Sequence, residues 1–115
     1  MELKKRAFIT GLGFITSIGN DAKEVSTNLR QLRSGIASWN FADTGKSAAV
    51  SVAGTIKEFD VSSHHWSKWQ YPDNYSFRPA TLRALPPHGL FALCAMEQAL
   101  VDAKLEPDEV QSEDT

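Results

Sequence analysis

Apolar residues recur at helical spacing after Asp21. Positions three and four residues apart lie on one face of a predicted helix: Ala22, Val25, Leu29 and Leu32. Asp21 is a favourable N-cap residue, and Glu24 three positions later gives a start that is typical of a capping box. Arg30 and Arg33 suit the last turn, and Gly35 stands where a left-handed residue often ends a helix. We therefore expect a helix that begins near Ala22 and ends before Gly35.

A second helix is predicted from Pro87 to Lys104, with proline in its first turn. Its apolar residues lie on nearly every side: Leu90, Phe91, Leu93, Cys94, Ala95, Ala99, Leu100 and Ala103. A helix of this kind is buried on several sides. Because 115 residues in two layers could hardly cover it, the pattern favours a chain that is part of a larger assembly.

A short apolar run from Ala7 to Leu12 lies between charged residues and glycine, and it predicts a buried strand of an α/β sheet. Nearby glycines mark a turn region, where the backbone can take positive φ or pack closely: Gly11, Gly13 and Gly19. The predicted fold class is therefore α/β, in the order strand, helix, strand and long buried helix.

The middle of the chain carries weaker signals. Ile36 to Lys46 predicts an irregular connection with a turn at Asp43–Gly45, and Ala48 to Ile56 predicts an exposed or edge strand with Gly54 as a candidate bulge. Lys57 to Pro87 predicts turns and short helical pieces held by aromatic packing. Its rings are Phe59, Trp66, Trp69, Tyr71, Tyr75 and Phe77.

The composition is that of a globular protein, with 42% hydrophobic and 23% charged residues. A net charge of −2 gives no reason to expect nucleic acid or an anionic membrane as a partner.

The longest strongly apolar run, Leu90 to Ala95, is too short to span a bilayer. The basic start, Met1 to Arg6, does not lead into a signal-peptide core. A single cysteine, Cys94, suits a reducing compartment, so we expect a cytoplasmic protein. Residues 1–105 are expected to form the N-terminal part of a domain, and the acidic tail from Glu106 to Thr115 is expected to be disordered.

Two glycine motifs share features with phosphate-binding loops. The turn Gly11–Gly13 lacks the third glycine of the dinucleotide fingerprint, because Thr16 takes that position, and the helix begins too late to hold a pyrophosphate. Gly45–Ser47 lacks the earlier glycine of a P-loop, whose place Asn40 takes. We expect a surface turn at Gly45–Ser47 and no bound cofactor. A nucleotide-binding domain remains an alternative that dinucleotide binding would reveal.

No residue is predicted to be catalytic or to hold a metal. Cys94 lies inside an apolar helix, which raises the pKa of its thiol, whereas a nucleophilic cysteine requires a lowered one. His64 and His65 are adjacent and point apart on regular structure, and His88 stands alone, so no spacing typical of a zinc site is present.

The aromatic segment also contains Lys68, Arg78 and Arg83 and allows two interpretations. Tryptophan and arginine are enriched at binding hot spots, so the segment could form an interaction surface. Alternatively the rings pack a loop onto the domain, which is the interpretation we prefer.

Four segments in one order resemble the start of a β-ketoacyl-[acyl-carrier-protein] synthase. Phe8–Asn20 (FITGLGFITSIGN) is similar to the first strand and loop of that family, and Asn28–Ile36 (NLRQLRSGI) to the following helix. Val52–Asp60 (VAGTIKEFD) is similar to the next strand, and Gly89–Leu105 (GLFALCAMEQALVDAKL) to the long buried helix. The resemblance covers nearly the whole chain but only about the first quarter of such an enzyme.

The resemblance implies part of a thiolase-like fold, usually dimeric. It also implies a decarboxylative condensation of a cysteine-bound acyl group with malonyl-[acyl-carrier-protein], in fatty-acid or polyketide biosynthesis. In the family the nucleophile lies in a Thr-Ala-Cys phrase and two histidines lie in His-Gly-Thr and Gly-His phrases. None of these phrases occurs in this sequence. Neither Cys94 nor His64, His65 or His88 matches those positions, so no catalytic role is carried over.

The sequence departs from the family pattern at two places. Ser76–Gly89 (SFRPATLRALPPHG) replaces a basic run that presents charge to the carrier protein in relatives. This leaves acyl carrier protein as a candidate partner without its usual contact and suggests a divergent member of the family. Lys104 stands where glycine is usual, so we expect that helix end to cap differently.

We therefore expect the N-terminal segment of a β-ketoacyl synthase-like protein, shortened by truncation, proteolysis or gene structure, and without condensing activity on its own. The alternative is a non-catalytic module of ketosynthase type. Such a module would form a homo-oligomer, or pair with a second ketosynthase polypeptide or a carrier protein. The acyl substrate and the pathway are not determined by these residues.

Overall fold

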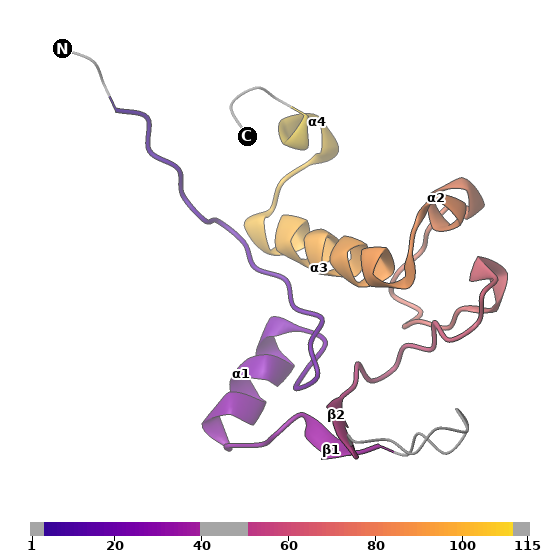
Figure 1. Ribbon diagram of the computed structural model, residues 1–115. Helices are drawn as coiled ribbons and strands as arrows, with labels where there is room; N and C mark the ends of the chain where they lie inside the picture. Colours follow the sequence, from indigo (N-terminus) through magenta and orange to yellow (C-terminus); the bar gives the residue numbers. More distant parts are fainter. Residues whose placement is uncertain (1–3, 40–50, 112–115) are drawn as a thin grey trace.

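The computed structural model describes residues 4–39 and 51–111 (Figure 1). Its elements are α1 (Ala22–Arg30), β1 (Ile36–Ser38), β2 (Val52–Gly54), the 3-10 helix η2 (Trp66–Lys68), α2 (Pro79–Ala84), α3 (Pro87–Ala103) and α4 (Pro107–Val110). This mixture of helices with a small two-stranded sheet is compatible with the predicted α/β class.

The segment before α1 is extended and crosses α3 (Figure 1). The prediction of a buried strand at Ala7–Leu12 is wrong here, because Phe8 and Ile9 are 77% and 86% exposed. Within the described ranges no strand pairs with this segment. A strand is buried only when other strands and layers cover it, and here α3 alone lies against it.

Two glycines allow this close crossing. A Cβ on Gly11 would lie 2.2 Å from the carbonyl oxygen of Ala99, and one on Gly13 would lie 1.8 Å from that of Ala95. Both distances are far shorter than any real contact, so only glycine fits at either position. The sequence analysis expected these glycines to allow either positive φ or close packing. The structure shows close packing at Gly11 and Gly13, and neither glycine has a positive φ.

Helix α1 begins as predicted. The Asp21 carboxylate accepts a hydrogen bond from the Glu24 N–H at 2.8 Å. The Glu24 side chain in turn accepts from the N–H of Asn20, one residue before the cap, at 3.0 Å. Two of the orphan donors near the helix start are satisfied in this way. Val25 is buried, whereas Leu29 is 58% exposed, so α1 buries less of its predicted face than expected.

The end of α1 comes earlier than predicted, at Arg30 rather than just before Gly35. Leu32 takes the left-handed conformation, with φ of 55°. The N–H groups of Leu32 and Arg33 donate to the carbonyls of Leu29 and Asn28 at 3.1 and 2.9 Å. This is the hydrogen-bond pattern of a Schellman motif, which closes the helix without a glycine.

The prediction of an irregular connection from Ile36 is wrong for its first residues, because they form β1. β1 pairs with β2 antiparallel, and Ile36 lies opposite Gly54 in a regular register. Gly54 is therefore a paired strand residue and not a bulge. β2 confirms the core of the predicted exposed strand, while the predicted turn at Asp43–Gly45 and residues 48–50 lie outside the described residues.

The core lies between α3 and the aromatic segment, and the aromatic packing expected between Lys57 and Pro87 forms part of it. Its buried residues are Tyr75, Leu82, Leu90 and Cys94. Partly buried residues pack around them: Ile15, Phe59, Val61, Trp66, Trp69, Tyr71 and Phe77. The Phe59 ring meets that of Phe91 edge-on, with 5.2 Å between centroids. η2 and α2 are the short helical pieces expected between Lys57 and Pro87.

α3 confirms the second predicted helix but is not covered all round. Leu90 and Cys94 are fully buried, whereas Met96 and Val101 are 58% and 78% exposed. Lys104 ends the helix in the left-handed conformation, with φ of 57°. Lys104 therefore adopts the backbone geometry of the glycine that it replaces, and the expectation of a different cap is wrong.

A further helical turn, α4, follows α3 within the tail for which no structure was expected. The Glu106 N–H donates to the Glu109 carboxylate at 2.7 Å, which closes a capping box. Both residues are exposed, and residues 112–115 lie outside the described residues.

Candidate functional site

The most connected polar group of the described chain is the side-chain amide of Gln98, at the crossing of the N-terminal segment and α3. Its Oε1 accepts from the Phe14 N–H at 3.0 Å. The two hydrogens of its Nε2 are shared among three acceptors, the carbonyls of Phe14 and Asn20 at 3.1 and 2.6 Å and the Tyr75 hydroxyl at 2.6 Å. One residue of α3 thus joins the N-terminal segment, the start of α1 and the aromatic core.

Asp102 makes a second contact one helical turn further along α3. Its carboxylate accepts from the Leu12 N–H at 2.9 Å. Four residues of helix rise about 6 Å, and two residues of extended chain span about 6.7 Å. Gln98 and Asp102 therefore match Phe14 and Leu12 in spacing. The sequence analysis missed this pair, although two polar residues at i and i+4 on an apolar helix are a readable signal.

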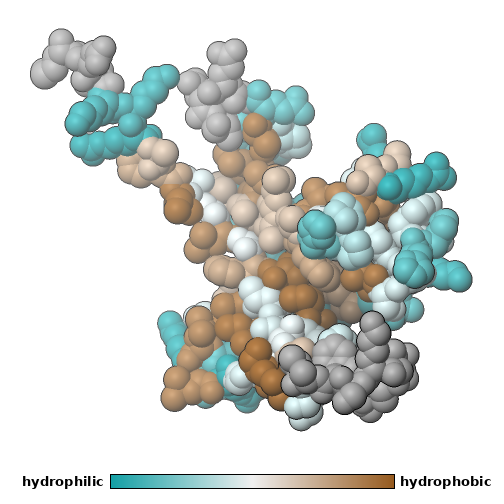
Figure 2. Space-filling model, in the orientation of Figure 1, coloured by the Kyte–Doolittle hydropathy of each residue, from teal (hydrophilic) through white to brown (hydrophobic). Residues whose placement is uncertain are grey.

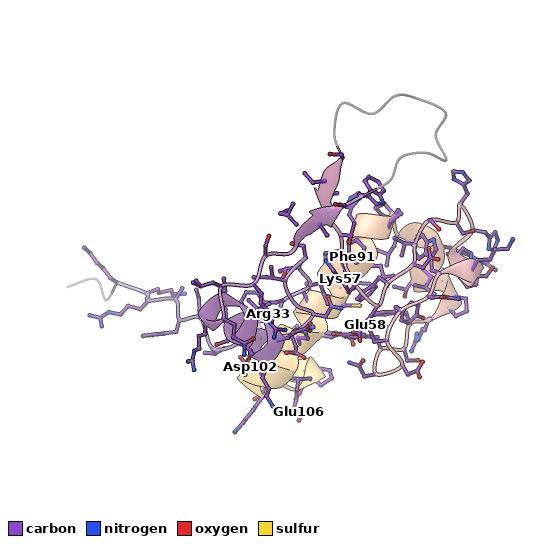
Figure 3. The ribbon with its side chains drawn as sticks, turned by 90° about the horizontal axis from the view of Figure 1, so that it is seen from below. Arg33, Lys57, Glu58, Phe91, Asp102 and Glu106 are labelled. Carbon is purple, nitrogen blue, oxygen red and sulfur yellow. The ribbon has the colours of Figure 1, made fainter. Side chains whose placement is uncertain are left out.

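A cleft of about 410 Å³ adjoins this crossing. It is lined by Leu12, Asp21, Ala22, Lys23, Asn74, Tyr75, Glu97, Gln98, Val101 and Asp102. Three carboxylates face one ammonium group, and the lining contains no thiol, serine hydroxyl or imidazole. Asp102 and Glu106 lie together toward the C-terminal end of α3, and Phe91 lies toward its other end (Figure 3). The lining therefore offers no thiol on which an acyl thioester could form.

Lys57 forms a second polar junction, near β2. Its ammonium group donates to the carbonyls of Ser17 and Thr55 at 3.1 and 2.8 Å, and contacts that of Gly35 at 3.5 Å. The Asn20 amide donates to the Lys57 carbonyl at 2.6 Å. Because internal carbonyls take the three donors of Lys57, this group ties segments together and is not directed toward a ligand.

Cys94 is fully buried in α3. Burial, and to a smaller extent the negative charge of Glu97, raises the pKa of its thiol to about 11. The predicted direction of this shift is confirmed. A thiol in this state is a core side chain and a poor nucleophile.

The three histidines are not brought together. His65 caps η2, its Nδ1 accepting from the Ser67 N–H at 3.2 Å, and its ring stacks on Trp66 at 5.5 Å. His64 and His88 are exposed at separate places. No cluster of three metal-ligating side chains occurs in the part of the chain that the structure describes.

The aromatic segment follows the packing interpretation. Trp66 and Trp69 pack against the buried core, and the Trp69 indole donates to the Ser63 carbonyl at 2.9 Å. The Arg83 guanidinium lies 5.6 Å from the Trp66 ring centroid. Lys68 and Arg78 are exposed, so the cations face solvent while the rings face the core.

The Gly11–Gly13 turn does not form a phosphate cradle. The N–H groups of Leu12 and Phe14 donate to Asp102 and Gln98, and the glycine backbone lies against α3. The second glycine motif, Gly45–Ser47, lies outside the described residues. Among the described helices none has the length and apolar character needed to cross a membrane.

Comparison with known proteins gives a consistent result. The family model for the N-terminal domain of beta-ketoacyl synthases matches residues 4–115. The 3-oxoacyl-[acyl-carrier-protein] synthase 1 of Escherichia coli K12 is 32% identical over 108 residues, which cover 94% of this chain and 23% of that protein. The corresponding synthase 2 of Synechocystis is 32% identical over 111 residues, covering 96% of this chain and 24% of that protein. The synthase 2 of Staphylococcus aureus COL is 29% identical over 109 residues, which cover 95% of this chain and 23% of that protein. The chain spans about a quarter of the length of these relatives. No solved structure matches it significantly.

Proposed function

The chain belongs to the β-ketoacyl synthase family, and we propose that it forms the N-terminal part of a 3-oxoacyl-[acyl-carrier-protein] synthase-like domain with a thiolase-like fold. The domain would act in fatty-acid or polyketide biosynthesis. The observation that carries the proposal is the family match over residues 4–115, together with relatives named for this synthase activity. Within the domain, residues 1–105 would be the main folded part, and residues 106–115 would follow as a tail that begins with the helical turn α4.

This part of the domain would supply scaffold and not chemistry. Cys94 is closed in the core with a raised thiol pKa, and the cleft beside Gln98 holds no thiol. What α3 does provide is a rigid base, on which Gln98 and Asp102 hold the extended segment. The cysteine thioester and the histidines that stabilise developing negative charge in this family would come from other residues of the domain.

Malonyl-[acyl-carrier-protein] decarboxylation and acyl transfer by the purified chain test the proposal. We expect rates equal to background, because the one thiol of the chain, that of Cys94, is buried and has a raised pKa. The intact E. coli synthase 1 under the same conditions provides the positive control. A rate clearly above background would overturn the scaffold role.

The alternative is a non-catalytic module that pairs with another polypeptide. Met96 and Val101 on α3 are 58% and 78% exposed, and a partner polypeptide or a second copy would cover them. A monodisperse homo-oligomer in solution, with no link to condensing activity, would support the module over the scaffold.

For either role we propose a cytoplasmic protein that works as a homo-oligomer or with a second ketosynthase polypeptide. Acyl carrier protein is the candidate transient partner, and the exposed Arg78 and Arg83 are the groups that would meet its acidic surface. Charge reversal at both positions should then weaken carrier-protein binding, and unchanged binding would exclude this contact.

A further inference from the structure

We infer that a cleft formed by residues 69–75 binds a small organic cation of the quaternary ammonium class. The inference goes beyond the proposed function, because it concerns a ligand that condensation does not use. The cleft has a volume of about 520 Å³, within the range of about 300–1,000 Å³ that small-molecule sites occupy. The residues that line this aromatic cleft are Trp69, Gln70, Tyr71, Pro72, Asp73 and Tyr75.

Three aromatic rings form much of the lining. Trp69 and Tyr71 are partly buried where they pack against the core, and Tyr75 is only 8% exposed. Each ring therefore contacts the core on one side and borders the aromatic cleft on another. The face of an aromatic ring carries partial negative charge and attracts a cation within about 6 Å of its centre, most strongly when the ring is that of tryptophan.

The charge of the aromatic cleft also favours a cation. Asp73 is exposed and supplies a carboxylate to the lining, whereas no lysine, arginine or histidine of the described residues lines it. A neutral ligand would gain little from this carboxylate, and an anion would be repelled by it. Ring faces and a carboxylate around one space are the combination that recognises a quaternary ammonium group.

The backbone of the aromatic cleft is held in place by hydrogen bonds within the chain. The Tyr75 N–H donates to the Pro72 carbonyl at 3.1 Å, which closes a turn and brings Tyr75 back toward Tyr71. Gln70 exchanges two backbone hydrogen bonds with Asp60, at 2.8 and 2.9 Å. A site that is ordered before binding loses less conformational entropy when its ligand arrives.

Side-chain contacts fix the rings themselves. The Trp69 indole N–H donates to the Ser63 carbonyl at 2.9 Å, and the Tyr75 hydroxyl accepts from Gln98 at 2.6 Å. The Phe77 ring lies nearly parallel to that of Tyr75, with 6.3 Å between centroids. Because the polar ends of Trp69 and Tyr75 are already paired, these two residues offer a ligand their ring faces.

The surface near the aromatic cleft does not resemble a docking face for an apolar polypeptide. Around η2, which directly precedes the cleft in sequence, the surface is mainly hydrophilic, and the apolar residues lie over α3 and the segment before α1 (Figure 2). A small polar cation suits these surroundings better than an aliphatic partner surface does.

Titration of the purified full chain with choline, followed by NMR chemical shifts, tests the inference. The control ligand is dimethylbutanol in which a carbon atom replaces the charged nitrogen of choline, so that shape is kept and charge is lost. We expect choline to bind at least about tenfold more tightly than this isostere. Equal affinities would show an apolar cleft without preference for a cation and would overturn the inference.

Substitutions in the lining test the named contacts. Asp73→Asn suits the turn but removes the charge, and Tyr71→Leu removes a ring face but stays apolar, so each should weaken choline binding at least about threefold. Tyr71→Phe keeps the ring and should keep the affinity. Asp108→Asn is the control for loss of a carboxylate, because Asp108 is exposed on α4.

Circular dichroism checks that each variant is folded, and Asp73→Asn decides alone if Tyr71→Leu is not. Choline binding that Asp73→Asn leaves unchanged would refute the role of the carboxylate and with it the inference. Aromatic grooves also bind polyproline II segments. A chain that binds a proline-rich peptide but not choline would have a peptide groove at this place, and the inference would be wrong.

Discussion

The side-chain amide of Gln98 pairs with both backbone groups of Phe14, accepting from the N–H at 3.0 Å and donating to the carbonyl at 3.1 Å. The carbonyl oxygen of a primary amide and the N–H beside it point to the same side, as the N–H and C=O of one strand residue do. Gln98 therefore makes the pair of bonds that a neighbouring strand residue would make. Through the same Nε2 it also contacts the Asn20 carbonyl and the Tyr75 hydroxyl.

Gln98→Leu should destabilise the chain by about 2–3 kcal/mol. The substitution keeps a similar volume but removes the bonds to Phe14, Asn20 and Tyr75 and leaves their polar groups unsatisfied. Urea denaturation followed by tryptophan fluorescence measures the change. Gln111→Leu is the control, because Gln111 is exposed at the end of α4, and its effect should be close to zero. Equal midpoints for both variants would contradict the role of Gln98.

Gly13→Ala should lower the free energy of unfolding by about 1–3 kcal/mol or more. The new Cβ would lie 1.8 Å from the Ala95 carbonyl oxygen and would force the segment away from α3. Gly89→Ala provides the opposite case. Gly89 lies within α3, and its Cβ would lie 3.0 Å from the end of the Leu85 side chain and 3.2 Å from the Pro86 ring. Alanine is favoured over glycine in a helix by up to about 1 kcal/mol, which offsets these milder contacts, so this variant should be close to neutral. Thermal denaturation of both variants checks the sign, and a stabilised Gly13→Ala would refute the close packing.

The elements that the sequence predicted correctly are those that depend on residues close together along the chain. The start of α1 at Asp21 and the span of α3 follow from capping and from apolar spacing within one turn or two. β1 was missed because its three residues are all exposed and show no alternation. The exposure of Ala7–Leu12 could not be judged from the sequence, because burial depends on which segments distant in sequence lie against it. The crossing held by Gln98 required knowing which helix the segment meets.

Lys104→Gly should stabilise the chain by about 1 kcal/mol, because Lys104 sits at φ of 57°, where a side chain is strained and glycine is not. The gain is partly offset by the greater freedom of glycine in the unfolded chain. Lys104→Ala keeps a Cβ and should bring no comparable gain, so it separates the conformational effect from loss of the charge. Denaturant titration of both variants decides between them. If the two variants are equally stable, strain at this position is not the cause.

Cys94 should resist alkylation in the folded chain. Burial raises the pKa of its thiol from 9.0 to about 11, so at pH 8 the folded chain has roughly a hundredfold less thiolate than the unfolded chain. Iodoacetamide labelling followed by mass spectrometry should therefore be at least about a hundredfold slower in buffer than in urea. The protonated thiol is the form that the fold prefers, so its contribution to stability is complete below pH 9 and is lost as the pH rises toward 11. Cys94→Ser provides the unlabelled control and should remove this loss of stability at alkaline pH. Equal labelling rates in buffer and in urea would show that the thiol is accessible and that α3 does not close over it.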